Sequence, residues 1–217
     1  MDKYSNFQLM REFENEGVDY RVGWRIGSSG IAILCIHGGD IEPGTSQVAD
    51  GIAGSDHTLY VLEGLKKSGN RTLHITSTLF DEPVALHIVC RSEIIISIHG
   101  CAELEEVVYL GGLDQELKKR IHDNLRDAGF RVLENENSSF GGVDRRNICN
   151  RCGRGMGVQM EISRGLRSQL FQDLTPAGRE HPTEAFHRFV HAVRDALEPF
   201  KKPLEEWAES IGSGAWS

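Results

Sequence analysis

Two apolar runs limit most strongly what this chain can fold into. Ile31-Ala-Ile-Leu-Cys-Ile36 contains no polar side chain, and Glu93-Ile-Ile-Ile-Ser-Ile98 has a single serine after its first residue. Short runs rich in β-branched residues are typical of strands buried on both faces, as in parallel sheets covered by helices. Because helical patterns alternate with such runs along the chain, we predict an α/β fold in which an open, mostly parallel or mixed β-sheet is flanked by helices.

The remaining elements follow from the same patterns. We predict strands over 57–62, 71–75, 106–110, 130–133 and 157–162, and helices over 46–53, 83–90, 114–128 and 182–200. Thr45 or Ser46 is the expected cap of the first of these helices. The stretch 135–142, rich in Asn, Ser and Gly, predicts a loop. No repeat or linker divides the 217 residues, so we expect a single domain over 1–203 and a flexible tail over 204–217.

Charge and composition exclude several classes of protein. The chain has 24 Lys and Arg against 32 Asp and Glu, a net charge of −8 at pH 7, which argues against a general nucleic-acid binder. Its apolar runs are much shorter than the roughly 20 residues that span a bilayer. The first residues lack the basic and apolar segments of a secretory signal. We therefore expect a monomer that is cytoplasmic as synthesised and has neither nucleic-acid nor membrane partners.

The five cysteines form an odd and sparse set, unlike the framework of a disulfide-stapled secreted domain. We expect mostly reduced thiols, with Cys35 and Cys90 buried in apolar surroundings. Cys149 and Cys152 have CxxC spacing, which leaves open a redox pair or half of a structural zinc site. No second CxxC occurs in the sequence, which weakens the zinc interpretation.

The residues that end the two buried strands carry the first candidate chemistry. His37 and His99 each precede a glycine at a predicted strand end, and Glu42 follows His37 by five positions in a glycine-containing loop. Ligands of open α/β sheets bind beyond the carboxyl ends of the strands, where such side chains converge. His, Glu and a distant second His form the ligand set of a catalytic zinc site that leaves its fourth position for water. The alternative is a pair of ordinary strand-end histidines bonded to nearby carbonyls.

Five motifs occur in order along the chain: His37-Gly-Gly-Asp-Ile-Glu42-Pro-Gly-Thr-Ser46, Leu73-His-Ile-Thr-Ser77, Ile96-Ser-Ile-His-Gly100, Asn147-Ile-Cys-Asn-Arg151 and Gly157-Val-Gln-Met-Glu-Ile-Ser-Arg-Gly-Leu-Arg167. Together they resemble the poly-gamma-glutamate hydrolase family of bacteriophages and bacilli, over about Tyr4 to Arg167. The resemblance implies a zinc-carboxypeptidase type of fold, cleavage of the γ-amide bonds of poly-γ-glutamate, and one zinc ion per chain held by His37, Glu42 and His99. A phage-encoded chain of this kind would be released by lysis.

Glu161 lies in an alternating strand pattern and shares a face with Gln159. The pattern alone favours a solvated carboxylate. The family resemblance instead implies a general base, which takes a proton from the attacking water and passes it to the leaving nitrogen. For that role, burial should raise the pKa of Glu161 toward the working pH.

Cations are needed to bind the free α-carboxylates of such a substrate. Residues 145–167 contain six arginines, one glutamate and no lysine, a local charge of +5 that leaves −13 for the rest of the chain. Arginine suits bidentate recognition of carboxylates, although a solvated basic loop has the same composition. Asn150 and Arg151 resemble the adjacent pair that holds the substrate carboxylate in carboxypeptidase-like zinc enzymes. Arg164 and Arg167 follow Glu161 closely enough to reach the cleft.

Two other functions remain compatible with these residues. One is a zinc amidohydrolase that acts on small N-acyl-glutamate or γ-glutamyl compounds. The other is a catalytically silent γ-glutamate-binding or thiol-redox module that keeps the fold without zinc. Cleavage of the polymer, and its response to a chelator, distinguish the three.

Overall fold

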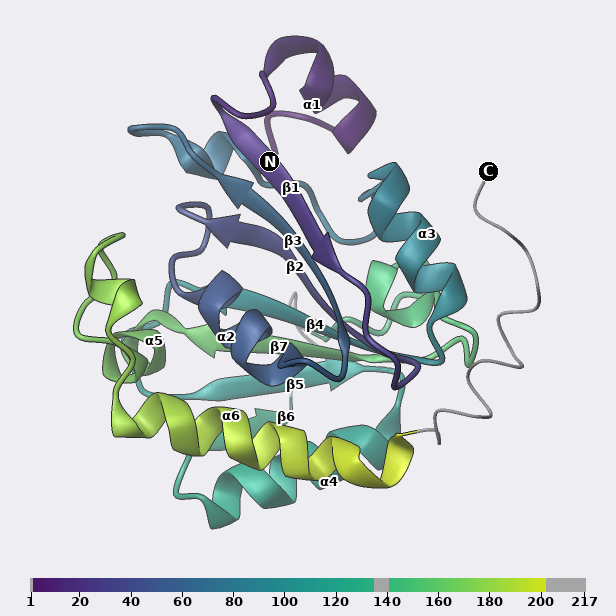
Figure 1. Cartoon of the computed structure of the whole chain (residues 1–217), viewed down its shortest axis with the longest axis vertical. Coiled ribbons are helices and arrows are strands. Elements are labelled where there is room, and N and C mark those ends of the chain that lie inside the picture. The colour runs from purple at the N-terminus through teal and green to yellow at the C-terminus, as the bar shows by residue number, and fades with distance from the viewer. Residues whose placement is uncertain (1, 135–140, 202–217) are drawn as a thin grey trace.

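A seven-stranded mixed sheet forms the centre of the molecule (Figure 1). The computed structural model describes residues 2–134 and 141–201. Within them the strands are β1 Tyr20–Arg25, β2 Ile31–Gly39, β3 Thr58–Gly64, β4 Ile94–Cys101, β5 Val108–Gly112, β6 Val132–Glu134 and β7 Val158–Ser163. Their order across the sheet is β1-β3-β2-β4-β7-β5-β6. The pairs among β3, β2, β4 and β7 are parallel, as is β5 with β6, whereas β1 runs antiparallel to β3 and β5 antiparallel to β7.

Helices cover both faces of this sheet. One face carries α2 Thr45–Ala53, α4 Gln115–Asp127, α5 Arg164–Leu170 and α6 Glu184–Leu197. The other carries α1 Phe7–Phe13, α3 Pro83–Arg91 and the short 3-10 segments Asn70–Leu73 and Ile148–Asn150. Further 3-10 turns lie at Gly178–Glu180 and Glu198–Phe200. The predicted single-domain α/β fold with helices on both sides of an open sheet is confirmed.

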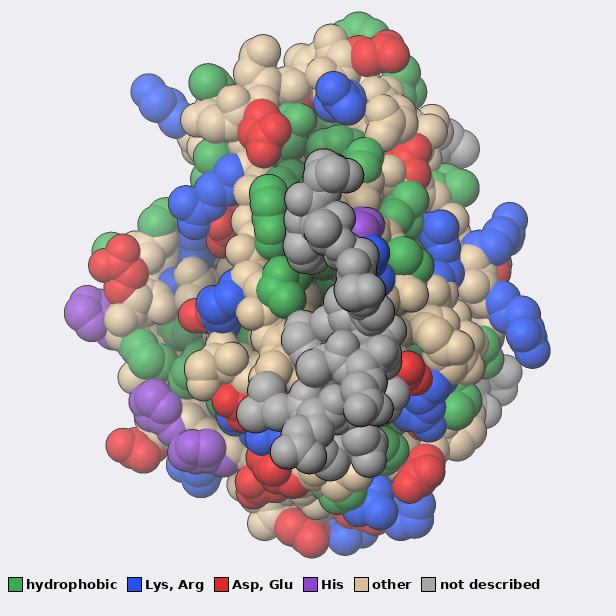
Figure 2. Space-filling view, turned by 45° about the vertical axis from the view of Figure 1, so that its right-hand side comes forward, with side chains coloured by type: hydrophobic (Ala, Val, Ile, Leu, Met, Phe, Trp, Pro, Cys, Tyr) green, Lys and Arg blue, Asp and Glu red, His purple; other side chains and the backbone are tan. Residues whose placement is uncertain are grey.

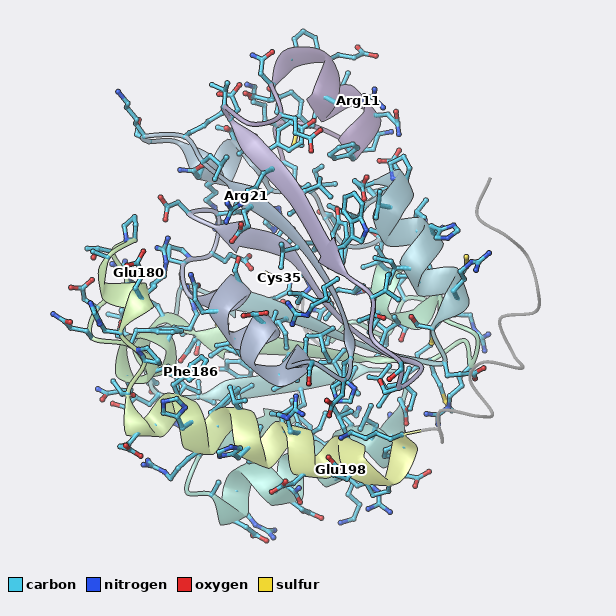
Figure 3. The ribbon with its side chains drawn as sticks, viewed as in Figure 1. Arg11, Arg21, Cys35, Glu180, Phe186 and Glu198 are labelled. Carbon is cyan, nitrogen blue, oxygen red and sulfur yellow. The ribbon has the colours of Figure 1, made fainter. Side chains whose placement is uncertain are left out.

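Strand β2 shows why an unbroken apolar run is needed in the middle of the sheet. Ile31, Ile33 and Cys35 pack into the apolar cluster beneath α2, α4, α5 and α6. The alternate residues, Ala32, Leu34 and Ile36, pack into the cluster on the opposite face. Figure 3 shows Cys35 near the centre of the sheet and Phe186 on α6. The ring of Phe186 packs against that of Phe171, with 5.3 Å between the ring centroids. Both faces of β2 are therefore covered, and His37 at its end is held on a rigid support.

Three local expectations are wrong. Residues 71–75 are not a strand, because Gly69 turns the chain with φ +77° and the Asn70 side chain bonds both the N–H and the C=O of Lys66. The first residue of α2 is Thr45 and its cap is Gly44, with no side-chain cap. The Thr45 hydroxyl instead donates to the carbonyl of Glu42. Cys90 is exposed on α3 rather than buried, whereas Cys35 is buried as expected.

Three elements have weak sequence signals and were not predicted. Strand β1 is an edge strand whose residues are mostly exposed or half-buried, so it lacks an apolar run. Helix α1 and helix α5 are only seven residues each. The C-terminal helix is shorter than expected, ending at Leu197 before the 3-10 turn. The predicted tail 204–217 and most of the predicted loop 135–142 lie outside the described residues.

The surface carries both signs of charge. On the face shown in Figure 2, basic and acidic side chains are interspersed around the periphery, and hydrophobic side chains gather toward the centre of its upper half. On the edge strand β1, Arg21 pairs with Glu63 of β3 at 2.5 Å. None of the helices in the described ranges has the length and apolar character needed to cross a membrane.

Candidate active site

The candidate site lies at the carboxyl ends of three neighbouring parallel strands. His37 is near the end of β2, His99 near the end of β4, and Glu161 on β7. Strands β2 and β4 are adjacent, and His99 and Glu161 are direct partners in the register of β4 and β7. His37 and His99, which are 62 positions apart along the chain, thus meet at the carboxyl ends of adjacent strands.

Glu42 reaches the same point through a tight turn after β2. The N–H of Glu42 donates to the carbonyl of His37 at 3.0 Å. Gly39 adopts φ +62°, and a Cβ there would lie 2.5 Å from the carbonyl oxygen of Gly64, so only glycine fits at this bend. The turn returns the chain toward the sheet, and the carboxylate of Glu42 accepts a hydrogen bond from the N–H of Gly100 at 2.7 Å.

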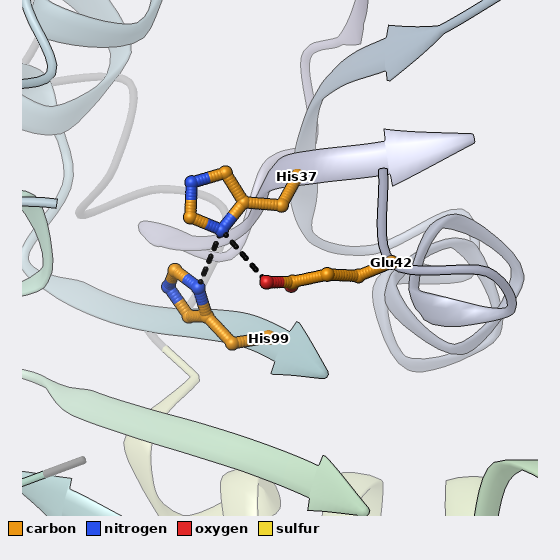
Figure 4. A group of neighbouring side chains, drawn as sticks. All are labelled: His37, Glu42 and His99. Carbon is orange, nitrogen blue, oxygen red and sulfur yellow. Dashed lines mark hydrogen bonds and ion pairs between the residues drawn. The ribbon is translucent and has the colours of Figure 1, made fainter. Parts of the chain in front are cut away.

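Three ligand atoms converge at this point (Figure 4). The Nδ1 atoms of His37 and His99 are 3.1 Å apart, and Oε1 of Glu42 is 3.3 Å from Nδ1 of His37. Candidate ligand atoms of all three residues lie within 4.8 Å of one another, and all three side chains are buried. The structure therefore brings together the three residues predicted as metal ligands.

The outer nitrogens of the two histidines are bonded to the protein. Nε2 of His37 lies 2.9 Å from the carbonyl oxygen of Ile75, so it must donate its proton there, since a carbonyl only accepts. In the neutral ring, Nδ1 then carries the lone pair that faces Glu42 and His99. Nε2 of His99 is 2.8 Å from the hydroxyl of Ser97, which can accept a proton in the same way. Such outer hydrogen bonds orient metal-binding histidines and fix which nitrogen is free.

The donor set fits a zinc ion. Zinc takes His nitrogen and carboxylate oxygen at about 2.0–2.2 Å, so two ligand atoms of a tetrahedral site lie about 3.3–3.4 Å apart. The separations of 3.1 and 3.3 Å are close to that value. In addition, two lone-pair atoms, Nδ1 of His37 and Oε1 of Glu42, face each other in a buried space, an arrangement that needs either a proton or a cation between them.

The charges of these residues perturb one another strongly. Burial alone would lower the pKa of His37, but the Glu42 carboxylate and the Ile75 carbonyl together raise it. Burial opposes ionisation of Glu42, but His37, His99 and the N–H of Gly100 outweigh that effect and hold its pKa well below the usual range. Burial and the neighbouring His37 lower the pKa of His99. The three side chains therefore interact strongly, and a divalent cation bound among them would compete with protons for the same lone pairs.

Glu161 lies beside the three candidate ligands and is 8% exposed. Burial first, and then the nearby Glu42 carboxylate, raise its pKa well above the ordinary value, while Arg167 and Gln159 oppose the shift. Nε2 of Gln159 donates to Oε1 of Glu161 at 3.1 Å, and Nδ2 of Asn147 donates to Oε1 of Gln159 at 2.8 Å. This chain of amides fixes the carboxyl group in the cleft.

These residues line a cleft of about 600 Å³, here called the histidine cleft. Its wall includes His37, Glu42, Arg71, His74, Thr76, Ser77, Thr78, His99, Asp144, Asn147, Gln159 and Glu161. The ring of His74 stacks on His37 with 3.9 Å between centroids, and Nδ1 of His74 lies 2.8 Å from a carboxylate oxygen of Asp2. His74 thus supports one face of a candidate ligand.

The four residues predicted to bind substrate occupy different environments. Asn150 is buried, and its amide bonds to backbone groups of Leu113, Gly157, Gly142 and Asp144. Arg151 is exposed and does not line the histidine cleft. Arg164 and Arg167 instead line a second pocket, which shares Glu42, Arg71, Gly100, Cys101 and Ala102 with that cleft. The geometry brings Arg164 and Arg167 to the site and keeps Asn150 and Arg151 out of it.

Sequence reasoning missed Arg71. It follows the turn at Gly69, lines both pockets, and lies two residues before the Leu73–Ser77 motif. The predicted strand over 71–75 concealed it, because a strand residue there would have been placed in the sheet rather than over the site. An arginine next to a site motif is the signal that could have identified it.

Comparison with known proteins places these residues in a family. The sequence profile of the poly-gamma-glutamate hydrolases matches residues 4–192. UPF0714 protein YndL of Bacillus subtilis is 41% identical over 194 residues, which cover 88% of this chain and 76% of YndL. The SPbeta prophage-derived UPF0714 protein YoqZ of the same organism is 41% identical over 179 residues, covering 82% of this chain and 65% of YoqZ.

Two solved structures share the fold. A bacteriophage poly-gamma-glutamate hydrolase is similar with a TM-score of 0.89 and 32% identity, covering 92% of this chain and 98% of that one. The zinc-free apo form of YndL gives a TM-score of 0.87 and 36% identity, covering 91% and 98%. The fold that the sequence resemblance implied is confirmed. The chain therefore belongs to the poly-gamma-glutamate hydrolase family and is a hydrolase.

Proposed function

We propose that this hydrolase cleaves the γ-glutamyl amide bonds of poly-γ-glutamate with one zinc ion per chain, held by His37, Glu42 and His99. The observation that carries the proposal is the convergence of these three buried side chains next to Glu161 in one cleft. The existence of a zinc-free form of YndL supports zinc as the metal. The match to the bacteriophage enzyme supports the substrate.

The protein's own residues would act on water and on the leaving nitrogen. Zinc at this site supplies a Lewis acid that activates water near neutral pH. Glu161 accepts the proton of the attacking water, because burial and the nearby Glu42 carboxylate raise its pKa above the ordinary value and so make it a stronger base. The hydrogen bond from Gln159 occupies Oε1 of Glu161, so Oε2 is the oxygen left to exchange the proton. The same group then donates that proton to the nitrogen as the amide bond breaks.

The experiment is a comparison of two carboxylate variants with the wild-type protein. Each is incubated with poly-γ-glutamate and with small N-acyl-glutamates, with and without a chelator, while chain length and bound metal are measured. We expect wild type to shorten the polymer in a chelator-sensitive reaction. Glu161→Gln should retain zinc and lose about 100-fold or more in turnover, whereas Glu42→Gln should lose zinc as well.

The outcomes separate the competing functions. Cleavage that persists in chelator, or near wild-type turnover by Glu161→Gln, refutes the proposed chemistry. Cleavage of the small acyl compounds but not of the polymer assigns the chain to the amidohydrolase alternative. Binding of the polymer without cleavage, and without metal, identifies a silent binding module.

A further inference from the structure

The pocket beside the histidine cleft has a distinct composition. We call it the arginine pocket; it measures about 460 Å³, and Arg71, Arg164, Arg167, Glu42, Leu174 and Thr175 contribute to its wall. Because it shares Glu42, Gly100 and Cys101 with the histidine cleft, the two pockets adjoin beside the candidate ligand Glu42, and together they are here called the groove. A substrate bound at the metal can therefore extend into the arginine pocket.

The two pockets differ in the charged side chains that line them, although Arg71 and Glu42 contribute to both. Among the described residues that line the arginine pocket, three are arginines and one, Glu42, is an acid. Among those lining the histidine cleft, one is an arginine, and three are acids: Glu42, Asp144 and Glu161. The lining of the histidine cleft also includes neutral hydroxyl and amide groups, such as those of Thr78 and Asn147.

The arginines are placed to accept an anion. Within the described part of the chain, neither Arg71 nor Arg164 has a hydrogen-bond or ion-pair partner for its guanidinium group, and both are exposed. Arg167 is 4% exposed, and its guanidinium donates to three backbone carbonyls, which hold it at the wall of the pocket. Burial lowers the pKa of Arg167, and the positive charge of Arg164 acts in the same direction. A carboxylate bound among the three would relieve this repulsion.

We propose that the enzyme requires a substrate α-carboxylate on only one side of the scissile bond, the side that enters the arginine pocket, and that Arg71 and Arg164 recognise it. This inference rests on the proposed function. On the other side, the part of the histidine cleft that the arginine pocket does not share has no arginine or lysine among its described lining residues, so no basic side chain there pairs with a second α-carboxylate. Substrates whose carboxylate on that side is replaced by a neutral group should remain good substrates.

The test uses short γ-glutamyl oligomers in which one α-carboxylate next to the scissile bond is converted to the amide. Two such oligomers, one amidated on each side, are compared with the unmodified oligomer. The oligomer amidated on the side that enters the arginine pocket should lose about 10- to 100-fold in kcat/KM, the range of one charge-assisted bidentate contact. The oligomer amidated on the other side should lose less than about 3-fold. Equal losses for the two oligomers refute the proposal.

The variants Arg71→Gln and Arg164→Gln identify the residues responsible. Each should lower kcat/KM about 10-fold for the unmodified oligomer and have little further effect on the oligomer that is already impaired, because the contact is then absent. Arg126→Gln, which changes an exposed arginine on α4 that lines neither pocket, is the matched control and should leave all three rates unchanged. Losses of equal size on all three oligomers would show a structural effect and overturn the assignment.

Binding of the same oligomers to the Glu161→Gln variant, measured by calorimetry, tests the pocket without turnover. The order of affinities should repeat the order of rates, and it should do so whether or not the γ-amide bond is cleaved. If wild type cleaves none of the oligomers but the one-sided binding preference is present, the proposed function fails and the arginine pocket stands. If cleavage occurs and binding is indifferent to both amidations, the pocket assignment fails and the proposed function stands.

Discussion

Arg167 connects the three chain segments that carry the candidate site. Its Nε donates to the carbonyl of Ile162 at 3.1 Å, next to Glu161. One terminal nitrogen donates to Pro43 at 2.5 Å, next to Glu42, and the other donates to Cys101 at 2.9 Å, two residues after His99. Gly100 permits this close packing, since a Cβ there would lie 2.8 Å from the guanidinium carbon. Replacing Arg167 should therefore disturb the fold and the metal site together.

The size of the effect follows from these contacts. A hydrogen bond from a charged donor contributes about 1.5 kcal/mol or more, so three contribute roughly 4–5 kcal/mol. Removing a buried cation recovers part of that amount, because the charge no longer has to be kept out of water. We expect Arg167→Leu to lower the free energy of unfolding by about 2–4 kcal/mol, which for a chain of this length lowers the melting temperature by roughly 4–16 °C. Zinc affinity should fall at least about 10-fold, because Glu42 is no longer fixed.

Differential scanning calorimetry and zinc titration measure the two effects. The matched control is Arg164→Leu on the same helix, because the side chain of Arg164 is exposed and takes no part in these three hydrogen bonds; this variant should keep the melting temperature within about 1 °C of wild type. The reasoning is refuted if Arg167→Leu unfolds within about 2 °C of wild type, or if both variants lose stability equally.

Three further predictions concern other parts of the molecule. Burial, then the charges of Arg194 and Lys201, lower the pKa of the buried His57 to about 4, so the unfolded chain takes up a proton first as pH falls below 6.5. The free energy of unfolding measured with urea should accordingly fall by up to about 3 kcal/mol between pH 6.5 and 4, and it should fall less steeply for His57→Asn. Removing zinc should lower the melting temperature of wild type, and adding zinc back at 100 times its dissociation constant should raise the free energy of unfolding by about 2.7 kcal/mol. The stability of His37→Ala should not change with added zinc. A thiol reagent should react rapidly with one cysteine, Cys90, in the folded protein, because the other four are buried, and Cys90→Ser should abolish the rapid phase.

The central strands were predictable because almost every residue in them is buried, which leaves an unbroken apolar run in the sequence. Both sides of β2 and β4 face helices, so neither strand tolerates a polar alternation, and their ends could be identified from His-Gly. The adjacency of β7 to β4 was not predictable in the same way, since it depends on pairing between distant segments. That pairing sets Glu161 opposite His99. The proposed role of Glu161 therefore comes from the family resemblance and not from its own strand pattern.

The misassigned segment 71–75 uses its backbone bonds to close local turns and not to join the sheet, since the N–H of Thr72 donates to Gly69 and that of His74 to Arg71. In residues 71–75 the buried Leu73 and Ile75 alternate with more exposed neighbours, as in a strand. The carboxamide of Asn70 nevertheless bonds the backbone of Lys66 on both sides and closes the turn before Arg71. A pattern of burial with period two is thus compatible with a loop that covers a site.

The charge of the site also depends on folding rather than on position along the chain. The segment 145–167 has a local charge of +5, yet Arg146 and Arg154 are ion-paired with aspartates, and Arg151 is exposed away from the groove. Arg164 and Arg167 reach the groove, and its third arginine, Arg71, comes from another segment that approaches through the turn after β3. A chain of net charge −8 can therefore present a compact cationic pocket. Because a field of one sign acts over about a Debye length, the rest of the surface would set how fast a polyanionic substrate approaches, while the proposed contact in the arginine pocket would set where it binds.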